Sequence, residues 1–191
     1  MTDGSGRDKA WPASALWDYA VALYASPGVA AACLALQDRR GTDVNLLLFA
    51  CWLGATGQEP NAGQLAEVLE RAEVWQADLV RPLREARRRL EAVLPTLEES
   101  LRPPLAAARA DLAAVELALE RGELLLLEGF TRDAAVDPAR RGRILANQIL
   151  RHIAAINRDD DSAFRALLAA AFPESGWADA TPADPASSNH T

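Results

Sequence analysis

Apolar residues recur at intervals of three and four along most of this chain, which is the spacing of one face of an α-helix. The pattern predicts helices over about 14–24, 27–38, 43–56, 63–101, 104–127, 138–157 and 162–172. In the helix at 138–157, Ile144, Ile149 and Ile153 are expected to face inward. No stretch shows the apolar–polar alternation of a β-strand. The chain is therefore predicted to be all-α, a single bundle of about six to eight helices.

The segment 43–56 differs from the others because it is apolar on every side after its first turn. A helix without a polar face is surrounded by protein rather than by water. Gly57 follows directly, and glycine is the residue most common just past a helix end. We predict that 43–56 is the central helix of the bundle.

Two longer segments, 63–101 and 104–127, carry apolar residues in a heptad-like pattern and meet at a Pro-Pro corner, which predicts an antiparallel helical hairpin. At the heptad positions of the first segment, Gln76 is the exception to an otherwise apolar series. Pro82 and Pro95 predict kinks or breaks, because proline is unfavourable inside a helix. The hairpin either projects from the rest or belongs to the bundle, and the bundle is favoured because short helices rarely stand alone.

Composition adds limits to this picture. The chain has 191 residues with 50% hydrophobic and 25% charged side chains, as in an ordinary globular domain. Residues 1–10 and 173–191 are polar and are predicted to be disordered, on either side of a single domain at 11–172. The formal charge of −7 argues against nucleic-acid binding. The longest apolar run is too short to span a membrane, and no signal peptide is recognisable, so a cytoplasmic protein is expected.

Polar side chains gather where the helices at 27–38 and 43–56 meet. Helix capping accounts for much of this, with Thr42 as the cap and Asn45 returning a bond to it. The alternative is a functional site in which a carboxylate acts as an acid or base at the mouth of a pocket. The candidate cluster consists of Gln37, Asp38, Asp43 and Asn45, and the candidate pocket lining of Trp17, Tyr24, Phe49 and Trp52.

Other chemistry is sparse. Arg81, Arg84 and Arg88 form a possible anion-binding patch, because guanidinium groups bind anions in a bidentate manner. Three glutamates at 116, 120 and 123 are interpreted as a solvated helix face. The chain has two histidines, no cysteine pair with zinc-ligand spacing and no glycine-rich phosphate loop, so neither a metal nor a cofactor is predicted. Cys33 and Cys51 lie in apolar helices, where free cysteine packs as a small hydrophobe.

Several short patterns in the first third of the chain are distinctive. They are Trp17, Leu23-Tyr24-x-x-Pro27-Gly28-Val29, Leu36-Gln37-Asp38, Gly41-x-Asp43-Val44-Asn45-Leu46-Leu47-Leu48 and Trp52-Leu53. With Trp75 and Pro82-Leu83-Arg84, they resemble a family of small bacterial proteins known only as a domain of unknown function. The resemblance covers roughly 11–150 and implies a helical bacterial protein. It implies no activity, cofactor or catalytic residue.

Two functions from different classes remain. The absence of catalytic signatures and the heptad spacing favour a protein-interaction or adaptor module, which binds another protein or a second copy of itself as a homodimer. The alternative is a small enzyme or a hydrophobic-ligand-binding protein, with its pocket near Tyr24, Gln37, Asp38, Asp43 and Asn45. No catalytic residue is assigned, and the sequence does not decide whether the protein is an enzyme.

Overall fold

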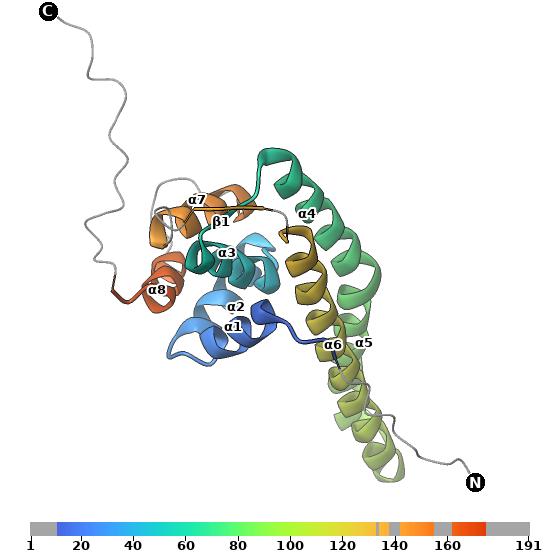
Figure 1. Ribbon diagram of the computed structural model, residues 1–191. Coiled ribbons are helices and arrows are strands. Elements are labelled where there is room, and N and C mark those ends of the chain that lie inside the picture. The colour runs from blue at the N-terminus through green and yellow to red at the C-terminus, as the bar shows by residue number, and fades with distance from the viewer. Residues whose placement is uncertain (1–10, 133, 138–141, 155–161, 175–191) are drawn as a thin grey trace, which may run out of the picture.

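The computed structural model describes residues 11–132, 134–137, 142–154 and 162–174. The predicted disordered lead, and all but the first two residues of the predicted tail, lie outside these ranges. Within them the prediction of an all-α fold is confirmed (Figure 1). The helices are α1 (Ala15–Tyr24), α2 (Val29–Arg40), α3 (Val44–Thr56), α4 (Ala62–Trp75), α5 (Arg81–Val93), α6 (Arg102–Phe130), α7 (Arg143–Ala154) and α8 (Ser162–Ala171).

Helix α3 is the centre of the molecule, as its uniformly apolar sequence predicts. Its side chains from Asn45 to Gly54 are all buried, and α1, α6 and α7 pack around it. Contact with α7 is close at Gly54, where an added Cβ would lie 2.6 Å from the Cβ of Ala146. Gly57 ends the helix with a φ of 73°, a left-handed conformation that glycine adopts without strain.

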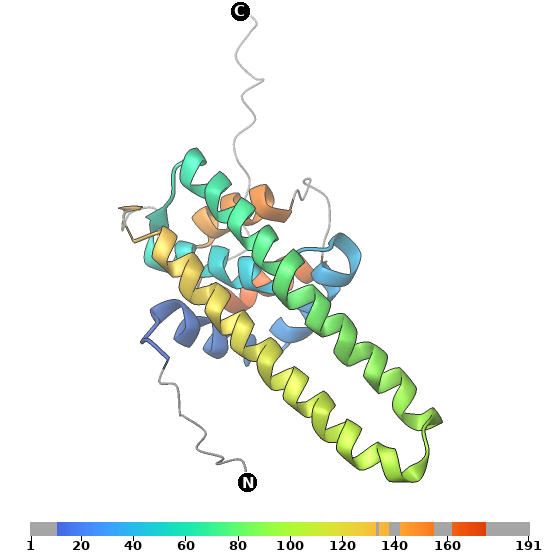
Figure 2. The same ribbon diagram turned by 90° about the vertical axis from the view of Figure 1, so that its right-hand side faces the viewer.

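Helices α4 to α6 form the predicted hairpin. Short 3₁₀ turns at Leu94–Thr96 and Glu99–Leu101 reverse the chain between its two limbs. Figure 2 shows the limbs side by side, with their far end extending beyond the body of the molecule. Residues 85–115, which we call the arm, include no buried residue. The hairpin is thus part of the bundle at its base and projects from it at its tip.

Pro82 acts on the helix before it. Between α4 and α5 the chain forms a π-helical turn over Gln76–Val80, closed by a hydrogen bond from the N–H of Arg81 to the carbonyl of Gln76. Proline lacks an N–H and its ring clashes with the carbonyl four residues back, which disfavours regular α-helix at this point. The wider turn is where we expected a kink or a break, and it faces the site described below.

A two-stranded sheet joins the end of α3 to the segment before α7. Strands β1 (Gln58–Glu59) and β2 (Ala135–Val136) pair antiparallel, with Gln58 opposite Val136. We predicted no strand, and pairs this short carry no alternation that a sequence pattern could reveal.

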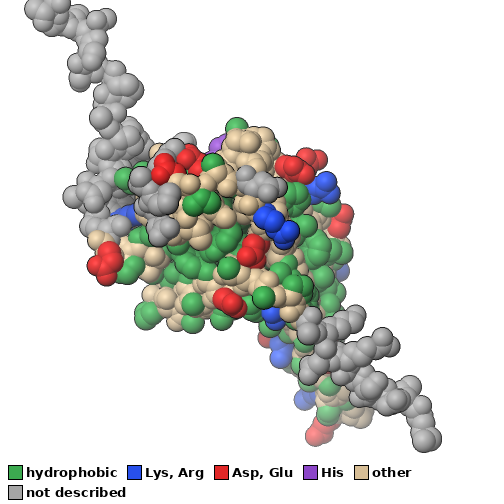
Figure 3. Space-filling model, in the orientation of Figure 1, with side chains coloured by type: hydrophobic (Ala, Val, Ile, Leu, Met, Phe, Trp, Pro, Cys, Tyr) green, Lys and Arg blue, Asp and Glu red, His purple; other side chains and the backbone are tan. Residues whose placement is uncertain are grey.

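In the space-filling view, acidic and basic side chains are interspersed with hydrophobic ones where the arm leaves the body (Figure 3).

Helix α7 departs from prediction at its start. We expected a helix from about 138, but the described helix begins at Arg143, and residues 138–141 and 155–157 lie outside the described ranges. Ile144 was predicted to face inward and is instead 55% exposed, whereas Ile149 is buried. The face of α7 that packs on α3 is carried by the small Ala146, with Leu145, Ile149 and Leu150 also buried.

Among the described residues, no single helix is both long enough and apolar enough to cross a bilayer. Helices α1 and α2 together have that length and hydrophobicity, but they are bent by 97° relative to one another.

Candidate functional site

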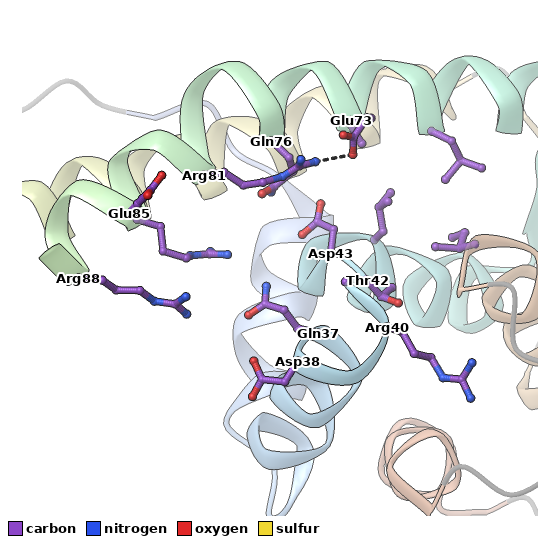
Figure 4. A pocket seen from close by; sticks show the side chains of 16 residues that line it. Gln37, Asp38, Arg40, Thr42, Asp43, Glu73, Gln76, Arg81, Glu85 and Arg88 are labelled. Atoms are coloured by element: carbon purple, nitrogen blue, oxygen red, sulfur yellow. Dashed lines mark hydrogen bonds and ion pairs between the residues drawn. The ribbon is translucent and has the colours of Figure 1, made fainter.

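A cavity of about 890 Å³ lies between the corner of α2 and α3 and the limb formed by α4 and α5. Figure 4 shows this cavity, with Gln37, Asp38 and Asp43 on one side and Gln76, Arg81 and Arg88 on the other. The structure therefore brings three of the four predicted cluster residues to one cavity wall. The fourth, Asn45, is buried directly behind them.

The local sequence places Asp43 at this wall. Gly41 ends α2 with a φ of 67°, so the chain turns at once and α3 begins three residues later, at Val44. Asp43, not Thr42 as we predicted, is the N-cap of α3, and its Oδ1 accepts a hydrogen bond from the N–H of Asn45 at 3.0 Å. A carboxylate at this position is also favoured by the positive end of the helix dipole.

Asn45 and Gln76 converge on one oxygen of Glu123. Each donates a side-chain hydrogen bond of 2.7 Å to Glu123 Oε2, from α3 and from the π-helical turn respectively. Asn45 also donates to the carbonyl of Glu120 at 3.1 Å. Our prediction that Asn45 returns a bond to the cap is therefore wrong, because its amide binds α6 instead. Glu123, from the middle of α6, is completely buried.

The carboxyl groups of Asp43 and Glu123 come together in this buried layer. Their remaining oxygens, Asp43 Oδ2 and Glu123 Oε1, are buried and accept no hydrogen bond from an N–H or hydroxyl of the described residues. Burial, and after it the charge of Asp43, raises the pKa of Glu123 to about 9. Burial raises the pKa of Asp43 as well, while the hydrogen bond with Glu123 opposes that rise. Glu123 is thus the protonated partner, and Asp43 is the carboxylate that accepts from it.

Beside this carboxyl pair lies a network of arginines and glutamates. Arg84 donates to Glu116 at 2.8 Å and to Glu120 at 2.6 Å, and Arg87 donates to Glu116 at 2.7 Å. Hydrogen bonds to the two arginines hold the pKa of Glu116 below its usual value, against a burial effect that raises it. Burial raises the pKa of Glu120.

These contacts correct our interpretation of the α6 glutamates. We took the three as a solvated face, but Glu116 is 7% exposed and Glu123 is fully buried. Their spacing of four and three equals that of the hairpin's apolar positions, and arginines recur at matching intervals on α5. That complementary spacing, with the lone polar heptad position at Gln76, was the sequence signal available for a buried polar layer.

The members of the predicted anion patch have different surroundings. Arg84 is held by the two glutamates, and Arg81 pairs with Glu73 at 2.5 Å. Arg88 lines the cavity and makes no ion pair within the part of the chain that the structure describes. It points from α5 across the cavity toward Gln37 in Figure 4.

A second cavity, of about 520 Å³, adjoins the first and is lined more heavily by apolar side chains. Trp17 and Tyr24, two of the four residues named as a candidate pocket lining, are among the residues that line it. Phe49 and Trp52 do not: they stack on each other in the core, with ring centroids 6.2 Å apart. Helix α3 is covered on all sides, so its aromatic residues are not available to a pocket at its N-terminus.

A family model covers most of the residues of this site. Residues 15–127 match the family model described as "Protein of unknown function (DUF2390)". The chain belongs to this family. The DUF2390 region contains the whole carboxyl pair and arginine–glutamate network, whereas α7 and α8 lie beyond it. No curated protein and no solved structure matches the chain.

The chemistry available here is that of an acid, a base and hydrogen-bonding groups. Among the described residues, no three His, Cys, Asp or Glu side chains are grouped so that they could hold a metal ion. A carboxylic acid kept neutral by burial can donate a proton, and its carboxylate partner can accept one. Asp43 lines both cavities, so one member of the pair is at the cavity wall and Glu123 lies behind it.

Proposed function

We propose that this protein binds a small polar molecule in the cavity between the α2–α3 corner and α4–α5, with the Asp43–Glu123 pair supplying acid–base and hydrogen-bonding groups. The observation that carries this proposal is a buried pair of carboxyl groups at the wall of a cavity of about 890 Å³. The proposal develops the alternative of a small enzyme or hydrophobic-ligand-binding protein with a pocket near Tyr24, Gln37, Asp38, Asp43 and Asn45, and changes its ligand to a polar one.

A purely structural role explains the carboxyl pair poorly. Burying a carboxyl group beside another opposes folding at neutral pH, because one of them must be kept protonated. A glutamine at position 123 would keep the hydrogen bonds to Asn45 and Gln76 without that penalty. Strongly perturbed carboxyl groups at a cavity are typical of functional sites.

The test is a thermal-shift screen of a small-molecule library against three proteins: wild type, Asp43→Asn and the control Asp111→Asn. Asparagine caps helices as well as aspartate does, so the first variant removes the charge while keeping the cap. Asp111 is exposed on α6. We expect compounds that raise the melting temperature of wild type and of Asp111→Asn but not of Asp43→Asn. A library with no such compound contradicts the proposal.

The arm supports a second function, the protein-interaction or adaptor role. It carries exposed apolar side chains at Val93, Leu101 and Val115, each between 46% and 48% exposed. We propose that a protein partner, or a second copy of the chain, packs on this surface. Val93→Asp with Val115→Asp should abolish a partner's co-purification, while Asp43→Asn leaves it intact. Loss with Asp43→Asn alone would assign binding to the cavity instead.

We also propose that the protein acts in the cytoplasm of a bacterium. Cys33 and Cys51 support this placement, because both are free thiols in the core. Burial raises the pKa of Cys33 to about 12, so the thiol is the stable form at neutral pH. Cell fractionation with an antibody against the chain would test the location, and recovery in an extracellular or membrane fraction would contradict it.

A further inference from the structure

The two cavities are neighbouring parts of one binding groove. Four residues line both of them: Gln37 and Asp43 on the body side, and Arg84 and Arg88 on α5. Beyond this shared zone the first cavity is bordered by polar and charged side chains of α4 and α5. The second is bordered mostly by apolar ones, including Trp17, Leu48 and Leu124, with the paired Arg87, Glu116 and Glu120 and the amide of Asn45 along its α3 and α5–α6 edges. A ligand at the shared zone can therefore extend an apolar group into the second cavity.

The charges at the shared zone can be assigned one by one. Arg84 is neutralised by Glu116 and Glu120, at 2.8 Å and 2.6 Å. Asp43 is the carboxyl group of the pair that ionises first, because burial and the charge of Asp43 raise the pKa of Glu123 to about 9, and its Oδ1 caps the positive end of α3. Arg88 keeps a positive charge and has no ion-pair partner among the described residues. The zone thus offers one anion and one cation from opposite sides of the groove.

We propose that the ligand is a zwitterion of the α-amino-acid type with an apolar side chain, an inference that rests on the function proposed above. Its ammonium group pairs with the Asp43 carboxylate, and its carboxylate pairs with the Arg88 guanidinium. Its side chain occupies the second cavity beside Trp17 and Tyr24. Both polar contacts are charge-assisted hydrogen bonds, the stronger class of hydrogen bond in proteins.

Glu123 sets the state of Asp43 in this arrangement. Its O–H donates to Asp43, which holds the carboxylate in place, while Asn45 and Gln76 hold Glu123 at its other oxygen. The groups that surround the carboxyl pair are Arg84 from α5, Glu120 from α6 and the two amides. Glu123→Gln keeps a donor toward Asp43 and is expected to retain binding, so Glu123 acts as a positioning residue for the ligand.

The experiment is calorimetric titration of the full chain at neutral pH with four probes: L-phenylalanine, phenethylamine, 3-phenylpropionate and glycine. The first carries all three recognised groups, and each of the others lacks one. We expect L-phenylalanine to bind at least about 10- to 100-fold more tightly than each of the others, as for the loss of one charged hydrogen bond or of apolar burial.

Variants assign each contact to a residue. Asp43→Asn should weaken L-phenylalanine and phenethylamine, whereas Arg88→Gln should weaken L-phenylalanine and 3-phenylpropionate. Arg89→Gln is the matched control, because Arg89 is the next residue on α5, is exposed, lines neither cavity and pairs with Glu85. Arg88 is also exposed, so its replacement tests the contact even if Asp43→Asn unfolds the protein.

Several results would overturn the assignment of a zwitterion. Equal binding of L-phenylalanine and either partial analogue would do so, as would an unchanged affinity in Arg88→Gln. If L-phenylalanine fails to bind while another library compound binds in an Asp43-dependent manner, the zwitterion is wrong and the proposed binding function stands. If no compound binds in that manner, both proposals fall.

Discussion

Replacing Glu123 with glutamine should remove a pH dependence of stability that the wild-type fold carries. In the folded protein Glu123 holds its proton up to a pKa of about 9, whereas its ordinary value is 4.5. Between these two values the folded state binds a proton that the unfolded state has lost. The free energy of unfolding is therefore highest at low pH and falls as pH rises toward the folded-state pKa.

The size of this effect follows from proton linkage. One proton bound only in the folded state lowers the free energy of unfolding by about 1.4 kcal/mol for each pH unit. From pH 5.5 to 7.5 the loss is then about 3 kcal/mol for the wild type. Asp43 and Glu120, whose pKa values burial also raises, add contributions of the same sign. Glu123→Gln should remove the contribution of Glu123 and leave that of Glu120.

The glutamine variant should gain stability relative to wild type as pH rises. Its amide can donate to Asp43, and its carbonyl can accept from Asn45 and Gln76, as the protonated acid does. We expect near-equal stabilities at pH 5 and a more stable variant at pH 7.5. The assay is urea unfolding followed by circular dichroism at several pH values, with the exposed Glu98→Gln as control. A wild-type slope that survives unchanged in Glu123→Gln would refute the proton-sharing pair.

Three further predictions concern the surroundings of the site. Arg84→Ala removes one of the two guanidinium partners of Glu116, which is only 7% exposed. The free energy of unfolding, measured by urea titration, should fall by about 2–4 kcal/mol. A change below about 0.5 kcal/mol would show that the network is not stabilising. Gly54→Ala should destabilise by about 1–3 kcal/mol, since its Cβ would lie 2.6 Å from an α7 side chain, whereas Gly129→Ala, with open space around it, should stabilise slightly. Equal melting temperatures for these two variants would contradict the close packing of α3 on α7. Ser14→Ala removes the N-cap of α1 and should cost about 1 kcal/mol, measured by thermal melting; an unchanged melting temperature would show that the cap is dispensable.

Local sequence predicted most of the secondary structure. The uniformly apolar run at 43–56 predicts a helix surrounded by protein, because it has no polar face to turn toward water. Helix α3 is that helix. The heptad spacing predicts both limbs of the hairpin. These are properties of short segments, so they can be derived without knowledge of the rest of the chain. The predicted corner at Pro103-Pro104 is wrong: the chain reverses over Leu94–Leu101, and both prolines lie in the first turn of α6, where their missing N–H groups have no helical partner to lose.

Tertiary structure decided what the polar residues do. Three glutamates on one side of α6 suggest a solvated face. Glu116 and Glu123 are buried and Glu120 is half-buried, because α3, the π-helical turn and α5 cover them. Ile144 is apolar, as core residues usually are, yet it is exposed. The face of α7 that packs on the bundle is formed instead by Leu145, Ala146, Ile149 and Leu150. A sequence pattern shows which residues share a face of a helix, but not which element will cover that face.

The carboxyl pair shows the same division. Sequence places Asp43 at a helix start and Glu123 in the middle of a heptad-patterned helix, 80 positions apart in the numbering. Nothing in the sequence around either residue indicates that the two carboxyl groups meet. Their shared proton depends on the desolvation that each receives when the hairpin closes over the α2–α3 corner. Sequence by itself determined the helices and the polar corner, whereas burial, which depends on contacts between distant segments, determined the chemistry of the site.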